Sequence, residues 1–222
     1  MAGPVLQAQN LYRFFRAGED ETLALCGVSL AMSPGERVVV AGPSGSGKST
    51  LLACLAGLDE PDGGTVRVAG HRLSHRPEAE RAALRARYIG VLYQHGNLLD
   101  HLTIMQNIQF VQRIAGRTDR TTPTSLLDAV GLAARAGAYP AELSGGESAR
   151  ASLAVALGNN PAVLIADEPT GELDGAAEQR LLALLAARAA AGTAVLTASH
   201  SPALLRAADR VVRLRDGQVD QS

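Results

Sequence analysis

The sequence predicts an α/β fold in which a mainly parallel β-sheet is covered by helices on both faces. Three short runs of aliphatic and β-branched residues, at 37–41, 162–166 and 193–198, have the composition of buried parallel strands. Segments with apolar residues at helical spacing separate these runs, and strands that alternate with helices usually pair in parallel. A chain of 222 residues can bury one substantial core, so we expect a single domain over residues 1–222.

The first 75 residues or so are expected to be mostly β-structure. Residues 22–30 form a strand candidate, and the Pro-Gly pair within 33–36 predicts a turn after it. The two glycines after Asp62 predict a second turn, which leads into an alternating apolar strand at 66–68. Between these segments, the strand at 37–41 precedes a helix at 49–58, where leucines recur at helical spacing.

A glycine-rich loop joins that strand to that helix. It fits the pattern G-x-x-x-x-G-K-[ST], whose backbone N–H groups surround phosphate oxygens. Lys48 is the only lysine among 21 basic residues, and we expect its compact ammonium group on the β- and γ-phosphate oxygens. We expect the Ser49 hydroxyl to bind Mg²⁺. A glycine turn that binds nothing is the alternative, but the order of strand, loop and helix favours a nucleoside triphosphate site made of Gly42, Pro43, Ser44, Gly45, Ser46, Gly47, Lys48, Ser49 and Thr50.

Two adjacent acids, Asp167 and Glu168, follow the apolar strand at 162–166. Desolvating carboxylates beside such a strand is costly, which favours a functional role over a solvated loop. Asp167 is expected to hold the metal through water, and Glu168 is the candidate general base for an attacking water molecule.

The rest of the chain predicts mostly helices. Residues 77–157 are expected to be mainly helical, with helices near 78–87, 104–114 and 125–130. Residues 175–191 form an amphipathic helix that ends at Gly192. Ser144 and Glu147 have the spacing of a capping box, and the Asp-Gly pair at 216–217 predicts a C-terminal hairpin.

The composition argues against several kinds of partner. A net charge of −1 produces no global field that would attract nucleic acid, so no nucleic-acid partner is expected. No apolar run approaches the roughly 18 residues of a membrane-spanning helix, and the first residues lack an export signal. Cys26 and Cys54 have no C-x-x-C or metal-ligand spacing, which predicts small buried side chains in a reducing compartment.

Five further motifs follow the glycine-rich loop in the order and spacing of an ABC-type ATPase, a family that the whole chain resembles. Gln94 lies in a segment similar to the Q-loop, 143–147 resembles the ABC signature, 163–169 the second nucleotide motif, 171–174 the D-loop, and His200 the switch histidine. The resemblance implies a P-loop NTPase fold, the ABC nucleotide-binding domain. It implies a RecA-like core with an N-terminal antiparallel β-subdomain at about 1–93 and 158–222, and a helical signature subdomain at about 94–157.

The resemblance also implies how the chain binds and hydrolyses ATP with Mg²⁺. Gln94 would bind Mg²⁺ or the attacking water, and Gln94 and His200 would sense the γ-phosphate. The signature residues Ser144, Gly145 and Gly146 would bind the nucleotide held by a second copy, which gives an ATP-dependent head-to-tail dimer. Asp174 of the D-loop would also bind nucleotide.

The aromatic residue that stacks on adenine in the family aligns with Phe15, and Tyr12 and Phe14 are the alternatives. One of the three is expected to fill the core. Three positions depart from the family pattern without removing a catalytic group, and they leave the rate of hydrolysis open. They are Ser148-Ala149 before Arg150 in the signature, Glu172 in the D-loop and Ser201 after the switch histidine.

Within the family, the chain resembles the lipoprotein-release and macrolide-exporter group (LolD- and MacB-like), to which the cell-division ATPase FtsE is related. The segments 17–21, 57–64, 89–94 and 97–99 carry this resemblance. It implies a motor at the cytoplasmic face of the inner membrane, attached through an integral permease with an extracytoplasmic domain. The motor would serve export, lipoprotein release or mechanotransmission. An FtsE-like regulator of an extracytoplasmic enzyme and an importer ATPase are the alternatives.

An apolar patch after Gln94 is the candidate dock for that permease. Its members are Leu98, Leu99, Leu102 and Ile104. The alternative is that these side chains belong to a helix core, because exposed patches and core stripes look alike in a sequence.

Overall fold

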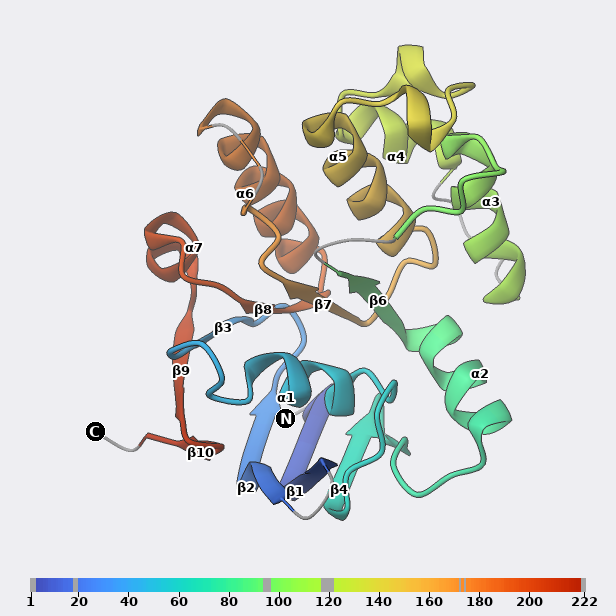
Figure 1. The fold of residues 1–222 in the computed structure, drawn as a ribbon. Helices are drawn as coiled ribbons and strands as arrows, with labels where there is room; N and C mark the ends of the chain where they lie inside the picture. The colour runs from blue at the N-terminus through green and yellow to red at the C-terminus, as the bar shows by residue number, and fades with distance from the viewer. Residues whose placement is uncertain are drawn as a thin grey trace.

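The chain folds into two β-sheets with one helix between them and further helices on the outer face of the larger sheet (Figure 1). The computed structural model describes residues 3–17, 20–93, 97–116, 122–171, 173 and 175–220. Among them, no helix has the length and apolarity needed to cross a membrane.

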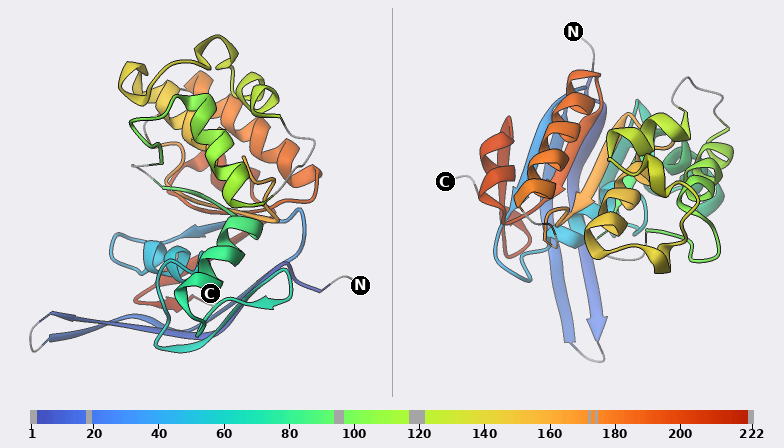
Figure 2. Two further views of the ribbon diagram at one scale, coloured as in Figure 1. Left: turned by 90° about the vertical axis from the view of Figure 1, so that its right-hand side faces the viewer. Right: turned by 90° about the horizontal axis from the view of Figure 1, so that it is seen from above.

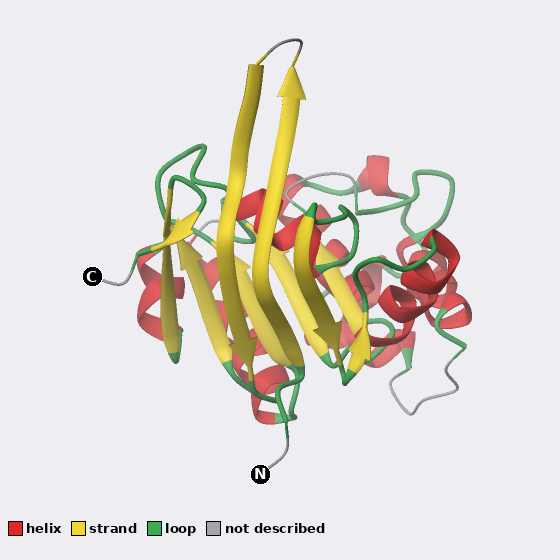
Figure 3. Ribbon diagram, turned by 90° about the horizontal axis from the view of Figure 1, so that it is seen from below, coloured by secondary structure: helices red, strands yellow, loops and turns green. Residues whose placement is uncertain are grey.

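The smaller sheet is antiparallel and has the strand order β2-β1-β4-β5. Its strands are β1 (Leu6–Ala17), β2 (Asp20–Met32), β4 (Gly63–Val68) and β5 (His71–Arg72). β1 and β2 form a long hairpin that continues past the ends of the neighbouring strands (Figures 2 and 3). The predicted turn at 62–65 lies partly within β4, whose first two residues are Gly63 and Gly64.

The larger sheet has the order β10-β9-β3-β8-β7-β6, and all its strands are parallel except β10. The strands are β3 (Arg37–Ala41), β6 (Ile89–Leu92), β7 (Val163–Asp167), β8 (Ala194–Ala198), β9 (Arg210–Arg215) and β10 (Gln218–Val219). The turn between β9 and β10 has positive φ at Asp216 (48°) and Gly217 (72°), as a two-residue hairpin of this type requires.

Helices cover both faces of the larger sheet, as predicted (Figure 1). α1 (Lys48–Leu55) lies between the two sheets and contacts β1, β2, β7 and β8. α6 (Gly175–Ala190) and α7 (Pro202–Ala207) pack on the opposite face, against β8 and β3. The helices beside the β6 edge are α2 (Glu78–Tyr88), α3 (Ile104–Ile114), α4 (Pro123–Ala129) and α5 (Gly145–Ala156).

The core has two parts, one on each face of the larger sheet. Val38 and Val40 pack with α1 and the smaller sheet, whereas Val39 packs with the helices on the other face. Side chains of a strand alternate between faces, so a strand buried on both faces needs apolar residues at every position. This explains why the run at 37–41 shows no polar alternation.

α5 packs its C-terminal end against the edge strand β6. A Cβ atom at Gly90 would overlap the carbonyl oxygen of Ala156, so the close approach of helix and strand requires glycine there. α5 rises about 1.5 Å per residue, which places its N-terminal residue Gly145 roughly 17 Å from Ala156 along the helix axis.

The structure differs from three sequence-based expectations. Residues 77–157, which were expected to be mainly helical, also contain the strand β6, which pairs with β7. Cys54 is buried, but Cys26 is only half-buried and accepts a hydrogen bond from the Gln218 side chain. None of Tyr12, Phe14 and Phe15 fills the core, since each side chain is more than a third exposed.

Candidate functional site

Four neighbouring parallel strands end at the same edge of the larger sheet. In the order β3-β8-β7-β6, Val40 pairs with Ala198, Ala198 with Asp167, and Ala166 with Leu92. The glycine-rich loop, the His200 segment and the two acids therefore start side by side, although they are far apart in the sequence. The predicted Gln94 comes two residues after β6 in the sequence and lies outside the described residues.

The glycine-rich loop is held closely between two strands. A Cβ at Gly42 would overlap the carbonyl oxygen of Leu214 in β9, and a Cβ at Gly47 would overlap that of Ala24 in β2. Gly47 has φ of 97°, a left-handed conformation that glycine adopts without strain. Gly45, by contrast, faces open space. The loop is therefore fixed at both ends and open at its centre.

Three features of this loop fit a phosphate group. Gly47 caps α1 without a side-chain hydrogen bond, so the N–H groups of the first turn have no partner within the helix. The Ser46 hydroxyl is buried and has no hydrogen-bond partner among the described residues. Lys48 is 9% exposed, and its Nζ donates to the carbonyl oxygens of Gly42 at 2.8 Å and Pro43 at 2.9 Å. Unpaired N–H donors at a helix N-terminus, together with an ammonium group, form an anion site.

Asp167 and Glu168 end the β7 segment in different environments. The carboxylate of Asp167 makes no hydrogen bond or ion pair with any residue the structure describes, so it is available to a cation. Glu168 has φ of 45°, a strained conformation for a residue with a side chain. Its backbone N–H donates to the carbonyl oxygen of Ala198 at 2.9 Å, which fixes this turn against the end of β8.

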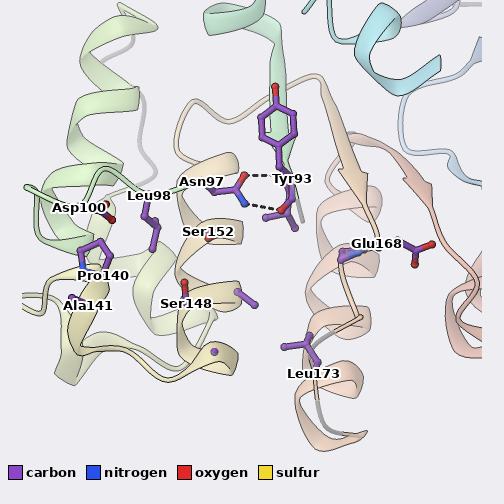
Figure 4. A pocket seen from close by; sticks show the side chains of 14 residues that line it. Tyr93, Asn97, Leu98, Asp100, Pro140, Ala141, Ser148, Ser152, Glu168 and Leu173 are labelled. Atoms are coloured by element: carbon purple, nitrogen blue, oxygen red, sulfur yellow. Dashed lines mark hydrogen bonds between the residues drawn. The ribbon is translucent and has the colours of Figure 1, made fainter. Parts of the chain in front are cut away.

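The structure brings Glu168 and His200 together, as the motifs predict for two residues of one site. His200 Nε2 lies 3.7 Å from Glu168 Oε1, and its imidazole is 60% exposed. The other carboxylate oxygen, Oε2, accepts a hydrogen bond from Ser199 Oγ at 3.1 Å. Figure 4 shows that the Glu168 carboxylate is turned away from Asn97 and Ser148, which lie across a cleft from it.

The predicted capping box at the start of α5 is confirmed. Ser144 Oγ accepts the backbone N–H of Glu147 at 3.3 Å, and Glu147 Oε2 accepts the backbone N–H of Ser144 at 2.9 Å. The hydrogen bonds from Ser144, first of all that of its backbone N–H, lower the pKa of Glu147. In the described part of the chain, no hydrogen bond or ion pair joins 143–147 to the glycine-rich loop, so the two helix N-termini are not in direct polar contact.

Residues 25–171 match the family described as ABC transporter. This chain belongs to that family. A lipoprotein-releasing system ATP-binding protein LolD from Granulibacter bethesdensis is 42% identical to this chain over 218 residues, which cover 96% of this chain and 95% of the relative. A macrolide export ATP-binding/permease protein MacB from Chromobacterium violaceum is 38% identical over 222 residues, which cover 99% of this chain but 34% of MacB.

Solved ABC cassettes have the same fold. The dimeric structure of MJ0796, a bacterial ABC transporter cassette, matches with a TM-score of 0.91 and 31% identity over 97% of each chain. A dimer of MJ0796 in a post-hydrolysis state, bound to ADP and Pi, matches with a TM-score of 0.90 and 30% identity. The chain is therefore an ABC transporter ATP-binding subunit of LolD/MacB type, with the ATPase fold and activity of its family.

The aromatic side chains of the ABC cassette at 12–15 lie on the exposed part of the β1–β2 hairpin. Phe15 is 43% exposed, and the guanidinium of Arg13 lies over its ring, 4.9 Å from the centroid. Arg13 is in turn fixed by a two-point hydrogen bond to Asp59 (2.8 and 2.9 Å) and by an ion pair with Asp62 at 3.1 Å. One face of the Phe15 ring is thus covered by a side chain that is itself held in place.

A cleft of about 420 Å³ separates α5 from the end of β7 in this ABC cassette (Figure 4). At its rim, Asn97 Oδ1 accepts the backbone N–H of Tyr93 at 2.8 Å, and Asn97 Nδ2 donates to the Tyr93 carbonyl at 2.6 Å. These two hydrogen bonds tie together the residues that flank 94–96. The residues lining the cleft include Tyr93, Asn97, Ser148, Ser152, Glu168 and Leu173.

The apolar patch that follows Gln94 is only partly a surface. Ile104 is fully buried in the core, so its prediction as part of a dock is wrong. Leu99 is 37% exposed, and Leu98 and Leu102 are half-buried. Below them, Asn107 is 2% exposed: its Oδ1 accepts the Leu99 N–H at 2.8 Å, and its Nδ2 donates to the carbonyl oxygens of Leu99, Leu102 and Thr103.

Sequence reasoning missed three residues of the site. Asn97, Asn107 and Ser199 each hold a segment of the ABC site by hydrogen bonds. A lone Asn or Ser carries little signal in a sequence, because the same residue types are common on surfaces and in turns. Only the position of Ser199, directly before the switch histidine at the end of an apolar run, pointed to this site.

Proposed function

We propose that this ABC ATPase is a motor subunit that dimerises head-to-tail on ATP and drives an integral membrane permease with an extracytoplasmic domain. The permease would be of the kind that LolD- and MacB-like subunits serve, and the motor would lie at the cytoplasmic face of the inner membrane. The observation that carries the proposal is the common sheet edge where the uncapped α1, Asp167, Glu168 and His200 meet. The 42% identity to LolD over nearly the whole of both chains supports the subfamily.

Residues 42–50 would bind the triphosphate of ATP. The N–H groups of the first turn of α1 and the unpaired Ser46 hydroxyl supply donors, and Lys48 would exchange its two carbonyl acceptors for phosphate oxygens. Ser49, Gln94 and the unpaired carboxylate of Asp167 would hold Mg²⁺. When bound, Mg²⁺ neutralises charge on the phosphate oxygens. The base would stack on Phe15, on the ring face that Arg13 leaves uncovered.

Glu168 would act as the general base. A carboxylate accepts a proton from water only if it is oriented toward that water. Three consecutive residues, the last of β8 and the two that follow it, contact Glu168. Ala198 accepts its backbone N–H, Ser199 donates to Oε2, and His200 faces Oε1. Gln94 and His200 would report whether a γ-phosphate is present. The hydrogen bond from the Glu168 N–H to Ala198 fixes the backbone of Glu168, which favours its role as a general base.

The signature would act on the nucleotide of the second copy. The N-terminus of α5 lies across the cleft from the end of β7, where Ser144 and Gly145 are exposed. A Cβ at Gly145 would meet nothing within 4 Å. Ser144, Gly145 and Gly146 are therefore open to a partner, and the dimeric structures of MJ0796 support such an arrangement. Asp174 of the D-loop, which would also bind nucleotide, lies outside the described residues.

Leu99, with the half-buried Leu98 and Leu102, would be the contact for the permease. The surface lies beside the cleft that Glu168 lines, so movement of a docked permease segment could reach the site over a short path. Asn107 supports the surface from below, since it fixes the backbone of 99–103 by four hydrogen bonds.

The test is to capture the tagged chain from detergent-solubilised native membranes and to identify what co-purifies. We expect a permease with few membrane spans and a large extracytoplasmic domain. A many-span importer permease, or no membrane protein, would contradict the proposal. The Leu99→Asp variant should no longer co-purify with this permease. Leu58→Asp is the matched control and should still co-purify with it, because Leu58 is 41% exposed and outside the proposed contact.

A further inference from the structure

Ser199 joins the segment after β8 to the carboxylate of Glu168. It is fully buried, and its backbone N–H donates to the carbonyl oxygen of Val40 in β3 at 3.2 Å. Its Oγ accepts the backbone N–H of Ser201 at 3.1 Å and donates to Glu168 Oε2 at 3.1 Å. A serine hydroxyl has one proton to donate, and an ionised carboxylate can only accept. The Ser199 proton therefore points at Glu168.

The same chain of hydrogen bonds continues to α6. Ser201 Oγ donates to Glu178 Oε1 at 2.6 Å and accepts the backbone N–H groups of Ala203 and Leu204, which makes it the N-cap of α7. Glu178 lies in the first turn of α6. Ser201 is thus held from both sides, and its N–H is fixed toward Ser199.

We propose that Ser199 is a positioning residue for hydrolysis, and that Ser201 and Glu178 fix its orientation. This inference rests on the proposed role of Glu168 as general base. The backbone of Glu168 is already fixed by the bond to Ala198, so rotation of its side chain is the freedom that remains. Ser199 restricts this rotation by occupying Oε2. Oε1, which faces His200, is then the oxygen that takes the proton from water.

The hydrogen bonds from Glu168 through Ser199 and Ser201 to Glu178 form a bridge between the end of β7 and α6. Its geometry also predicts which substitutions at 199 and 201 it tolerates. Threonine at 199 keeps a hydroxyl that can donate to Glu168, whereas alanine removes it and leaves the Ser201 N–H without its acceptor. At 201, aspartate would retain an N-cap but place a second carboxylate against Glu178. A hydroxyl at 201 can both donate to Glu178 and accept the N–H groups that begin α7.

The test compares Ser199→Ala with Ser199→Thr by steady-state ATPase kinetics on the purified full chain with its permease. We expect Ser199→Ala to lower kcat roughly tenfold to a hundredfold, because small errors in the position of a reacting group have effects of this size. The KM for ATP should stay within about twofold, since the phosphate contacts remain. Ser199→Thr should retain most of the activity.

Ser74→Ala is the matched control. Ser74 is 2% exposed and its Oγ accepts the Val66 N–H at 2.9 Å, so the change removes a similarly buried hydroxyl beside the other sheet, in the loop after β5. It should leave kcat unchanged. An unaltered kcat in Ser199→Ala, or an equal loss in both variants, would overturn the inference.

Two further variants separate the bridge from the base. Glu178→Ala should lower kcat several-fold alone and add nothing in a Ser199→Ala background, because both act through the same carboxylate. Additive losses would contradict a connected bridge. If Glu168→Gln stops hydrolysis while Ser199→Ala does not change it, the bridge is wrong and the base assignment stands. If Glu168→Gln still hydrolyses ATP, the base assignment fails and the inference fails with it.

Discussion

The Lys48 ammonium group donates to the carbonyl oxygen of Gly42 at 2.8 Å, six residues before it in the same loop. The bond to Gly42 and a second bond to Pro43 at 2.9 Å hold the charge against the first residues of the loop, and Lys48 is itself the first residue of α1. A buried cation with only neutral partners favours an anionic ligand.

Replacing Lys48 by Ala should therefore weaken ATP binding by at least about tenfold, the usual scale of a lost charge-assisted hydrogen bond. Lys48→Arg should also lose affinity, because a planar guanidinium does not replace a compact ammonium group between two carbonyl oxygens. Titration with a fluorescent ATP analogue measures the change. Arg67→Ala, at an exposed arginine of β4, is the control, and full affinity in Lys48→Ala would show that the loop is not the phosphate site.

Glu168→Gln should stop ATP turnover and preserve nucleotide binding. An amide keeps the size of the side chain and can still accept the Ser199 hydroxyl, but it cannot take a proton from water. ATP should then trap a dimer that is visible by sedimentation velocity. Glu80→Gln, at an exposed glutamate of α2, is the control; it should hydrolyse ATP and exchange between monomer and dimer. Turnover at the normal rate in Glu168→Gln would rule out Glu168 as the base.

Phe15→Ala should weaken ATP binding by about 1–3 kcal/mol, the cost of losing an aromatic platform for a base. Tyr12→Ala and Phe14→Ala are matched controls, because their side chains are similarly exposed on the same hairpin. Arg13→Met should weaken binding less than Phe15→Ala, since Arg13 only supports the ring. Isothermal titration with ATP and with GTP measures all four variants, and a greater loss in Phe14→Ala would move the platform to that residue.

Asn107→Ala should destabilise the protein by about 3 kcal/mol, because it leaves the Leu99 N–H and the Leu102 carbonyl group without their hydrogen bond. The carbonyl groups of Leu99 and Thr103 each lose one of two hydrogen bonds, since they also accept the backbone N–H groups of Leu102 and Asn107. Urea unfolding followed by circular dichroism measures the free energy of unfolding. Gln109→Ala, two residues further along α3, should change it by less than about 0.5 kcal/mol. Equal effects of the two substitutions would mean that the loop at 99–103 does not depend on Asn107.

The ion pair between Asp209 and Arg37 should make stability depend on pH. The side-chain and backbone hydrogen bonds from Arg37 lower the pKa of Asp209 below its ordinary value. The stabilisation is therefore present above the unfolded-state pKa of about 3.9 and is lost as the pH falls through the lower folded-state pKa. The side chains of Arg37 and Asp209 are 33% and 45% exposed, so solvent limits the effect to about 0.5–1 kcal/mol.

Unfolding at pH 7 and at pH 3 compares the wild type with Asp209→Asn. The variant should be less stable at pH 7, and the difference should shrink at pH 3. Glu80→Gln removes the exposed pair with Arg76 and should show little difference at either pH. A difference between wild type and Asp209→Asn that grows toward low pH would contradict the direction of the pKa shift.

The elements that the sequence predicted well are those whose pattern is local. The strand at 37–41 and the helix at 104–114 have the predicted bounds. A run of valines directly indicates a buried strand, and apolar residues spaced three and four apart directly indicate a helix. β6 was missed because it has only four residues, one of them glycine, and its β-structure depends on pairing with β7. Secondary structure that depends on a distant partner leaves a weak pattern in its own segment.

The residues of the site were likewise predictable only where their sequence signal is local. The residues at 42–50 form a contiguous motif, and their loop has the expected place between β3 and α1. Ser199, by contrast, acts on a residue 31 positions away, and Asn107 acts through its burial, which a single asparagine does not reveal. The roles of Gln94 and Asp174 stay predictions, because both residues lie outside the described part of the chain.

The place of β3 within the sheet has a consequence for biosynthesis. β3 pairs with β8 on one side and with β9 on the other, and the paired residues lie 158 and 172 positions after those of β3. At ordinary rates of translation, both edges of this apolar strand wait on the order of ten seconds for their partners. During that time the glycine-rich loop has neither Leu214 nor the end of β8 beside it. A ribosome-bound fragment therefore cannot consume ATP, and the unfinished strand is a natural substrate for chaperones.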